Sequence, residues 1–172
     1  ERKAWNYMTE WNTKSGHVTY KESGDKLPAI SKYYNYDNGA PGSSQLANGI
    51  TCIYRYAEVL LMYAEACAMT NDANGANTAL KIVRQRAGLA EKTFAQADLM
   101  AEIEHQCLLE FFGEGHRFDD LKRWYTTQEI KAIFNANEKQ GADNFQEKYK
   151  YYPIPSGELN NNNAMVQTEL WR

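Results

Sequence analysis

Apolar residues recur at three- and four-residue steps through the middle of the chain. The first stripe lies within residues 52–69 and consists of Ala57, Leu60, Leu61, Ala64, Cys67 and Ala68. This spacing places the six side chains on one side of an α-helix. A turn-forming run at residues 71–75 follows, and a second stripe over residues 76–87 ends at Gly88, a residue type favoured just past helix ends. The short turn predicts that the two helices lie antiparallel.

Further helices are predicted beyond this hairpin. Thr93 and Gln96 have the spacing of a capping box before a third helix that ends near Gly113. A shorter helix through residues 118–124 and one or two turns at residues 128–135 follow. Residues 138–146 are predicted to form a polar loop, residues 149–154 an extended aromatic segment, and residues 155–172 a tail that wraps the surface.

The first fifty residues show no sustained period, because glycines and prolines interrupt them. We expect this region to form loops and a short strand pair, with extended segments at residues 17–21 and 31–36. The fold class is therefore mainly α, with antiparallel, tetratricopeptide-like helical hairpins, long irregular loops and little strand. We expect a loop-rich segment at 1–51, helical hairpins at 52–135 and an extended tail at 136–172.

Charge and composition exclude several classes of function. Lys and Arg number 19 against 22 Asp and Glu, so the net charge of −3 offers no basic excess for nucleic acid. Apolar runs are far shorter than the ~20 residues of a membrane span. The 12 Tyr, 4 Trp and 6 Phe suit either sugar-binding surfaces or core packing, and composition leaves that choice open.

The cysteines and the first residues of the chain give no evidence of a metal site or a targeting signal. Cys67 and Cys107 are expected to be buried thiols, since the three cysteines, with Cys52, lack metal-ligand spacing and cannot all pair. No phosphate-binding loop or metal motif is present, so no cofactor and no metal are predicted. The chain starts at Glu1 without a leader sequence, which indicates either a cytosolic protein or an excerpt.

Residues 108–120 concentrate carboxylates, a histidine and an arginine. If the helix continues, Glu110 and Glu114 lie roughly 6 Å apart, a separation that glycoside hydrolases use. The same spacing also suits buried bidentate ion pairs with arginines. We favour a structural ion-pair network without catalysis, made of Arg84, Arg86, Glu110, Glu114 and Arg117.

Several ordered motifs resemble the C-terminal region of the SusD/RagB family. These are YRYAEVLLMYAEA at residues 54–66, VRQRAGL at 83–89, EFFGEGHRFDDLKRW at 110–124 and YPIPSGELN at 152–160. The resemblance covers about residues 54–172 and implies a SusD-like fold. Family members are much longer, so it also implies that the leader, the lipidated cysteine and N-terminal helical repeats lie outside this chain.

The resemblance implies a non-catalytic, surface-exposed outer-membrane lipoprotein that binds an oligosaccharide or another nutrient. It would act as a lid on a SusC-like TonB-dependent transporter and meet the membrane only through its lipid anchor. Trp5, Trp11 and Tyr34 are candidates for stacking on sugar rings, because they precede the helical scaffold. A glycoside hydrolase that uses Glu110 and Glu114, and a helical scaffold that only docks another protein, remain the alternatives.

Overall fold

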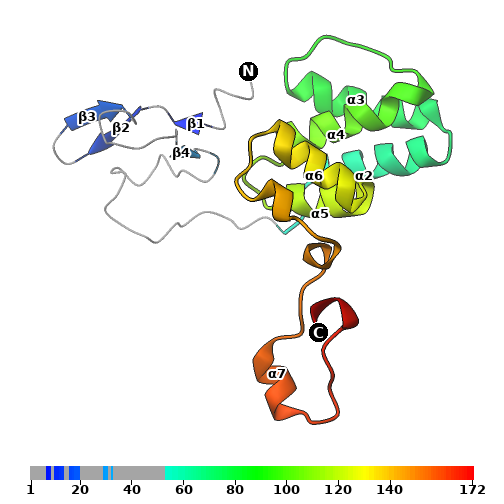
Figure 1. Ribbon diagram of the computed structural model, residues 1–172. Coiled ribbons are helices and arrows are strands. Elements are labelled where there is room, and N and C mark those ends of the chain that lie inside the picture. The colour runs from blue at the N-terminus through cyan, green and yellow to red at the C-terminus, as the bar shows by residue number, and fades with distance from the viewer. Residues whose placement is uncertain (1–6, 9, 14–15, 20–28, 31, 33–52) are drawn as a thin grey trace. The chain divides into compact units, whose positions relative to one another are not determined.

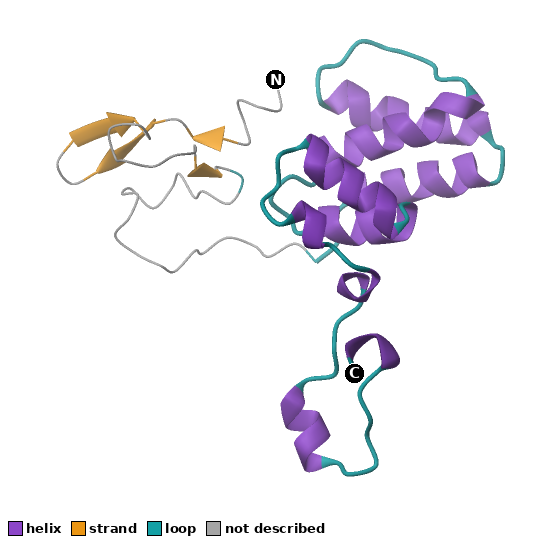
Figure 2. Cartoon of the chain, in the orientation of Figure 1, coloured by secondary structure: helices purple, strands orange, loops and turns teal. Residues whose placement is uncertain are grey.

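The computed structural model describes residues 7–8, 10–13, 16–19, 29–30, 32 and 53–172 (Figure 1). The chain divides into two compact units, Glu1–Gly115 and His116–Arg172, and each is described here by itself. Helix is the main secondary structure in both units, as Figure 2 shows. Strands occur, among the described residues, only before residue 31. The predicted fold class, mainly α with little strand, is confirmed.

Two short antiparallel strand pairs form the described beginning of the first unit. Strand β1 (Tyr7–Met8) pairs with β4 (Ala29–Ile30), and β2 (Glu10–Thr13) pairs with β3 (Gly16–Thr19). In the second pair, Trp11 lies opposite Val18 and Thr13 opposite Gly16. The structure thus contains a short strand pair, as expected, and a second pair in addition. The extended segment expected at residues 31–36 lies, except for Lys32, outside the described residues, as do residues 37–52.

Helices α2 (Tyr56–Met69) and α3 (Ala73–Arg86) form the predicted hairpin. Helix α2 begins at Tyr56 instead of residue 52, because Arg55 has an extended backbone and serves as the N-cap. Between the helices, Asn71 takes a left-handed conformation at φ 61°. The Asp72 carboxylate then accepts the backbone N–H of Gly75 at 2.9 Å and so starts α3.

Small residues let the two helices of the hairpin approach closely. Ala64 and Ala76 are fully buried, and a side chain at Gly75 would overlap the Asp72 carboxylate and the Cys67 sulfur. Large apolar side chains fill the rest of this core, namely Leu61, Leu80, Val83, Leu99 and Ile103. Most residues of the apolar stripes identified in the sequence therefore lie in one hydrophobic core, whereas Leu60 and Ala87 are only partly buried.

Helix α4 (Leu99–Glu110) packs against both α2 and α3, after the short 3-10 helix η2 (Gln96–Asp98). The capping box predicted at Thr93 and Gln96 is wrong. Helix η2 follows Ala95, and no side chain caps either helix start. The Gln96 amide instead donates to the Ala68 carbonyl at 2.6 Å, a tertiary hydrogen bond that ties η2 to the end of α2.

The second unit starts with α5 (His116–Trp124) and α6 (Thr127–Ala136). A capping box does occur here: Thr126 and Glu129 exchange side-chain and backbone hydrogen bonds at the start of α6. Phe145 contacts Phe118 and Phe134 edge to face, with ring centroids 6.3 and 5.3 Å apart.

The segment expected to be an extended tail contains short helices. These are η3 (Ala142–Asn144), η4 (Glu147–Lys150), α7 (Ser156–Asn161) and η5 (Glu169–Trp171). Tyr149, expected to be extended, lies in η4. The Trp171 indole donates to the Tyr151 carbonyl at 3.1 Å, so the end of the chain folds back onto η4. No helix among the described residues has the length and apolarity to cross a bilayer.

Candidate functional site

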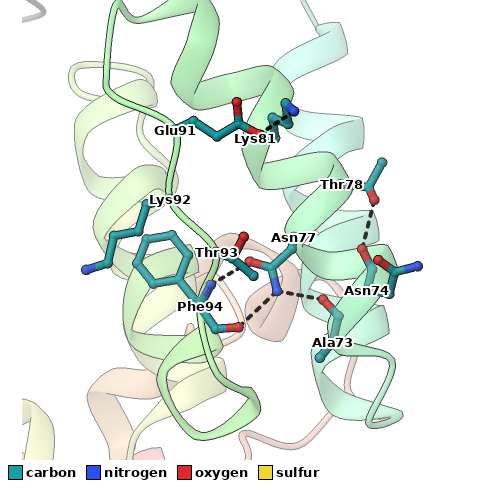
Figure 3. A pocket seen from close by; sticks show the side chains of 9 residues that line it. All are labelled: Ala73, Asn74, Asn77, Thr78, Lys81, Glu91, Lys92, Thr93 and Phe94. Carbon is teal, nitrogen blue, oxygen red and sulfur yellow. Dashed lines mark hydrogen bonds and ion pairs between the residues drawn. The ribbon is translucent and has the colours of Figure 1, made fainter.

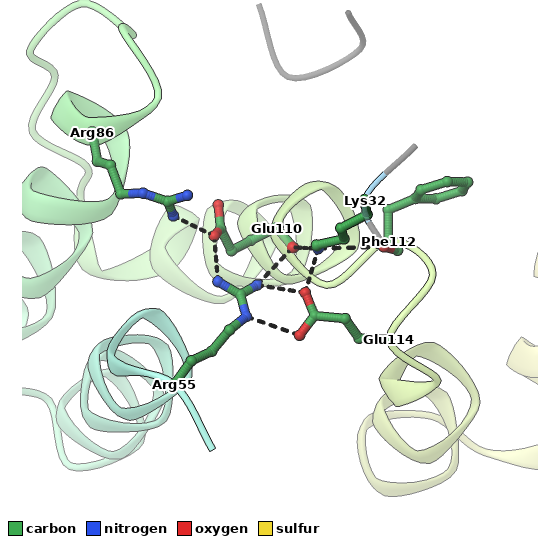
Figure 4. A network of polar contacts seen from close by, with 6 residues as sticks. All are labelled: Lys32, Arg55, Arg86, Glu110, Phe112 and Glu114. Carbon is green, nitrogen blue, oxygen red and sulfur yellow. Dashed lines mark hydrogen bonds and ion pairs between the residues drawn. The ribbon is translucent and has the colours of Figure 1, made fainter. Parts of the chain in front are cut away.

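The carboxylates of Glu110 and Glu114 meet at the end of α4. Glu110 is the last residue of that helix, and Gly113 and Gly115 adopt left-handed backbones at φ 78° and 87° in the turn that follows. Glycine adopts such angles without steric strain, so the chain can turn and bring Glu114 beside Glu110. Arg55, at the start of α2, extends between the two carboxylates (Figure 4).

Arg55 is the centre of this arrangement. Its Nε and Nη2 donate to the two carboxylate oxygens of Glu114 at 2.8 and 2.7 Å. Its Nη1 donates to Glu110 Oε1 at 2.7 Å, and Nη2 also donates to the Glu110 carbonyl at 2.7 Å. The guanidinium also lies 5.0 Å from the centre of the Phe111 ring. A single arginine therefore binds both carboxylates and the last carbonyl of α4.

Two further cations complete what we call the Arg55 cluster, defined as Arg55, Glu110, Glu114, Lys32 and Arg86. The Lys32 ammonium pairs with Glu114 and donates to the carbonyls of Glu110 at 2.5 Å and Phe112 at 3.3 Å. Arg86 donates from Nη1 to Glu110 Oε1 at 2.5 Å. The side chains of Glu110 and Glu114 are only 6% and 14% exposed, so water screens their pairs with Arg55 and Lys32 weakly, whereas Arg86 is 66% exposed.

The cluster keeps both carboxylates ionised. Burial alone would raise the pKa of Glu110, but hydrogen bonds from Arg55 and Arg86 outweigh it and hold the pKa below its ordinary value. Burial also acts to raise the pKa of Glu114, and hydrogen bonds from Arg55 and Lys32 lower it. A glycoside hydrolase needs one carboxyl that stays protonated at working pH. Neither Glu110 nor Glu114 meets that requirement.

The structure distributes the arginines of the predicted network over different places. Arg86 contacts Glu110 in the Arg55 cluster. Arg84 pairs with Glu102 at 2.5 Å and lies 5.2 Å from the Phe94 ring centre. Arg117 lies on α5, in the second unit. Arg55 and Lys32 were not among the partners predicted for Glu110 from the sequence, although Arg55 belongs to the YRYAE motif that resembles the SusD/RagB family.

The aromatic candidates for sugar stacking lie largely beyond the structural description. Trp5 and Tyr34 are outside the described residues. Trp11 lies on β2, where its backbone pairs with Val18 of β3, and its side chain is not described. These three residues therefore stay predictions.

A polar hollow of about 320 Å³ lies beside α3 and the loop that leads to α4 (Figure 3). The Asn77 amide donates to the Phe94 carbonyl at 2.9 Å and accepts the Phe94 N–H at 2.8 Å. Lys81 and Glu91 form an ion pair at the edge of the hollow. These contacts bind the loop to α3, and no signal in the sequence distinguishes Asn77 from the other asparagines.

No group of three or more His, Cys, Asp or Glu side chains within the described residues is placed to hold a metal ion. Cys67 and Cys107 are buried thiols, as predicted. Cys52 lies outside the described part of the chain.

Comparison with known proteins identifies the fold. The chain is 27% identical over 96% of its length to SusD-like protein P2 of Formosa agariphila, and 30% identical over 84% to the starch-binding protein SusD of Bacteroides thetaiotaomicron. It spans only 36% and 26% of the length of these relatives.

Solved structures agree with the sequence comparison. A SusD superfamily protein from Bacteroides vulgatus matches 69% of this chain and 27% of its own, with a TM-score of 0.62 and 30% identity. A SusD-like protein from Bacteroides fragilis has the same fold over 96% of this chain and 37% of its own, with a TM-score of 0.65 and 23% identity. The profile of the SusD family matches residues 2–171, and the chain therefore belongs to the SusD family.

Proposed function

We propose that this chain is part of a non-catalytic, surface-exposed glycan-binding protein of the outer membrane, which delivers its ligand to a SusC-like TonB-dependent transporter. Membership of the SusD family and similarity to a starch-binding relative support the proposal. A lipid anchor on the full-length polypeptide would hold it at the cell surface. Oligosaccharide is the ligand class that the relative's starch binding favours.

The Arg55 cluster is the observation that separates binding from hydrolysis. Glu110 and Glu114 are the carboxylate pair that the hydrolase alternative requires. Arg55 hydrogen-bonds to both oxygens of Glu114 and to Oε1 of Glu110, and together with Lys32 and Arg86 it offsets the two negative charges. A pair held in this way has neither a proton to donate to a leaving group nor a free carboxylate to attack a sugar. Its function is to tie α2 to the end of α4.

Glycan binding would use flat aromatic side chains and nearby amide or carboxylate groups. Trp5, Trp11 and Tyr34 are the proposed stacking residues, on the loop-rich beginning of the chain. An aromatic ring against the C–H face of a neutral sugar gives modest affinity and needs neither metal nor cofactor. Modest affinity suits a protein that must release its ligand to a transporter.

The test is a titration of the full-length protein with neutral oligosaccharides, starch-derived ones included, followed by calorimetry and by chromatography of the sugar. We expect saturable binding with no cleavage, and Trp11→Ala should weaken it by about tenfold, the equivalent of one lost stacking contact. Tyr152→Ala, at a 79% exposed tyrosine of the second unit, is the matched control and should leave affinity unchanged.

Two outcomes would overturn the proposal. If the wild type cleaves an oligosaccharide and Glu114→Gln abolishes that cleavage, the protein is a glycoside hydrolase. If the protein binds no glycan but still co-purifies with the SusC-like transporter, it is a scaffold that only docks another protein. Co-purification that is lost when the lipid anchor is removed from the full-length protein would support surface attachment.

A further inference from the structure

The Lys32 side chain docks on the end of helix α4, 78 residues further along the chain (Figure 4). Its Nζ donates to the carbonyl oxygens of Glu110 at 2.5 Å and Phe112 at 3.3 Å, and it pairs with the Glu114 carboxylate. An ammonium group has three protons to donate, so these three acceptors use its full capacity. The Lys32 side chain is only 22% exposed, so water competes weakly for the contact.

The position of this contact suits a positive charge. Glu110 is the last residue of α4, and the final carbonyls of a helix lack partners within the helix and form the negative end of its dipole. Lys32 and Arg55 both donate to the Glu110 carbonyl. Arg55 lies at the start of α2, whereas Lys32 follows the strands at the beginning of the first unit. Lys32 therefore attaches the strand region to the helices.

A short path along the backbone leads from Lys32 to Trp11, a proposed sugar-stacking residue. One residue separates Lys32 from β4, and β4 pairs with β1 so that Ile30 lies opposite Tyr7. Trp11 follows Tyr7 by four residues, which span at most about 14 Å. The strand pair that restrains the backbone near Trp11 is thus the one that Lys32 attaches to α4.

We propose that Lys32 is a positioning residue for glycan binding, because its docking on α4 holds β4, β1 and Trp11 in the arrangement that binds the sugar. The inference rests on the proposed glycan-binding function. Lys32 acts without contacting the sugar, since its three protons are already donated. When Lys32 is undocked, only a fraction of the molecules has the binding arrangement, and the affinity falls by that fraction.

The helices of the first unit do not depend on this contact. Their apolar core consists of side chains from α2, α3 and α4, and Arg55 bonds to Glu110 and Glu114 without help from Lys32. Loss of the Lys32 ammonium should therefore release the strand pair and leave the helices folded. This difference separates a positioning role from a general contribution to stability.

The first test compares Lys32→Met with the wild type, both as full-length proteins. Calorimetry with starch-derived oligosaccharides should show a rise in Kd of about three- to tenfold. Hydrogen exchange in peptides that cover β1 and β4 should be about tenfold faster, with unchanged helical circular dichroism. Lys32→Arg should recover part of the affinity, because it keeps the charge and the N–H donors. Lys81→Met, the matched control at an exposed ion pair, should change neither affinity nor exchange.

Lysine acetylation of the wild type gives a second readout that needs no substitution. If docking strengthens sugar binding, bound sugar must strengthen docking by the same factor. Saturating oligosaccharide should therefore slow acetylation of Lys32 by about three- to tenfold. Acetylation of Lys81, whose side chain is 45% exposed, should keep its rate.

The outcomes separate this inference from the function on which it rests. If the wild type binds oligosaccharide and Lys32→Met binds it equally well, the inference is overturned and the proposed function stands. The same holds if bound sugar does not slow acetylation of Lys32, a result that decides the matter even if Lys32→Met fails to fold. A wild type that binds no oligosaccharide would overturn both.

Discussion

Arg55 and Glu114 are 59 residues apart in the sequence and meet through two parallel hydrogen bonds, Nε to Oε2 at 2.8 Å and Nη2 to Oε1 at 2.7 Å. The planar guanidinium matches the carboxylate in this geometry, and the two bonds fix both distance and orientation. The start of α2 is thereby attached to the turn after α4.

Replacing Arg55 by Met should destabilise the protein. The change leaves two largely buried carboxylates with only Lys32 and Arg86 as cationic partners in the cluster, and we expect a loss of about 2–4 kcal/mol in the free energy of unfolding. Arg55→Lys should recover only part of it, because one ammonium cannot make both parallel bonds. Urea denaturation of the full-length protein, followed by circular dichroism, measures the effect.

The control is Lys81→Met, which removes a cation from an ion pair whose side chains are 45% and 63% exposed. Exposed pairs contribute little, so the expected change is within about 0.5 kcal/mol. Equal effects of Arg55→Met and Lys81→Met would mean that the Arg55 cluster does not hold the helices together.

Acid should weaken the same cluster. The pKa values of Glu110 and Glu114 lie below the ordinary 4.5 in the folded protein, so their ionisation stabilises the fold above that pH. The contribution is lost as the pH falls from about 4.5 through the folded pKa values. The stability difference between wild type and Arg55→Met should therefore be constant near neutral pH and shrink below pH 4.5. Denaturation midpoints from pH 7 to about 3 check this, and a difference that stays constant into acid would contradict it.

The helices could be predicted from the sequence because their evidence is local. The stripe through Ala57, Leu61, Ala64 and Ala68 has a period that only a helix produces, and these residues are buried. The residues at which helices start were harder to predict from the sequence. Thr93 with Gln96 and Thr126 with Glu129 share one local pattern, yet only the second pair forms a capping box. The Gln96 amide bonds to Ala68, a contact that depends on tertiary packing.

The partners of Glu110 could be predicted only in part, for a geometric reason. Arg84 and Arg86 are two residues apart on α3, so their side chains leave the helix on nearly opposite sides. Only one of them can reach Glu110, and Arg84 meets Glu102 instead. Arg55 was missed because its partner depends on how α2 lies against α4, which no local pattern records.

Gly75→Ala should destabilise the hairpin even though alanine favours helix. Intrinsic propensity would gain roughly 1 kcal/mol inside α3. The added Cβ would overlap the Asp72 carboxylate and lie 2.7 Å from Cys67 Sγ, so the N-cap and the helix contact must both shift. We expect a net loss of about 1–3 kcal/mol, typical of overpacking.

Gly157→Ala on α7 is the matched control, because a Cβ there would meet no atom within 4 Å. It should be neutral or stabilise by up to about 1 kcal/mol. Thermal unfolding of both variants gives the comparison. A Gly75→Ala protein as stable as Gly157→Ala would show that the α2–α3 turn accommodates a Cβ at position 75 without a steric clash.

Asn77→Asp should loosen the connection between α3 and α4. The Asn77 amide group donates to the carbonyls of Ala73 at 2.7 Å and Phe94 at 2.9 Å, and a carboxylate offers neither donor. A carboxylate would instead face the Phe94 carbonyl, and we expect a loss of about 1–3 kcal/mol in unfolding free energy. A carboxylate oxygen can still accept the Phe94 N–H, which Asn77 Oδ1 accepts at 2.8 Å, so the loss comes from the two donor bonds and is measured by urea denaturation. The control is Asn74→Asp: this exposed position in the first turn of the same helix favours a negative charge, so stability should not fall. An Asn77→Asp protein as stable as Asn74→Asp would mean that the loop is held by other contacts.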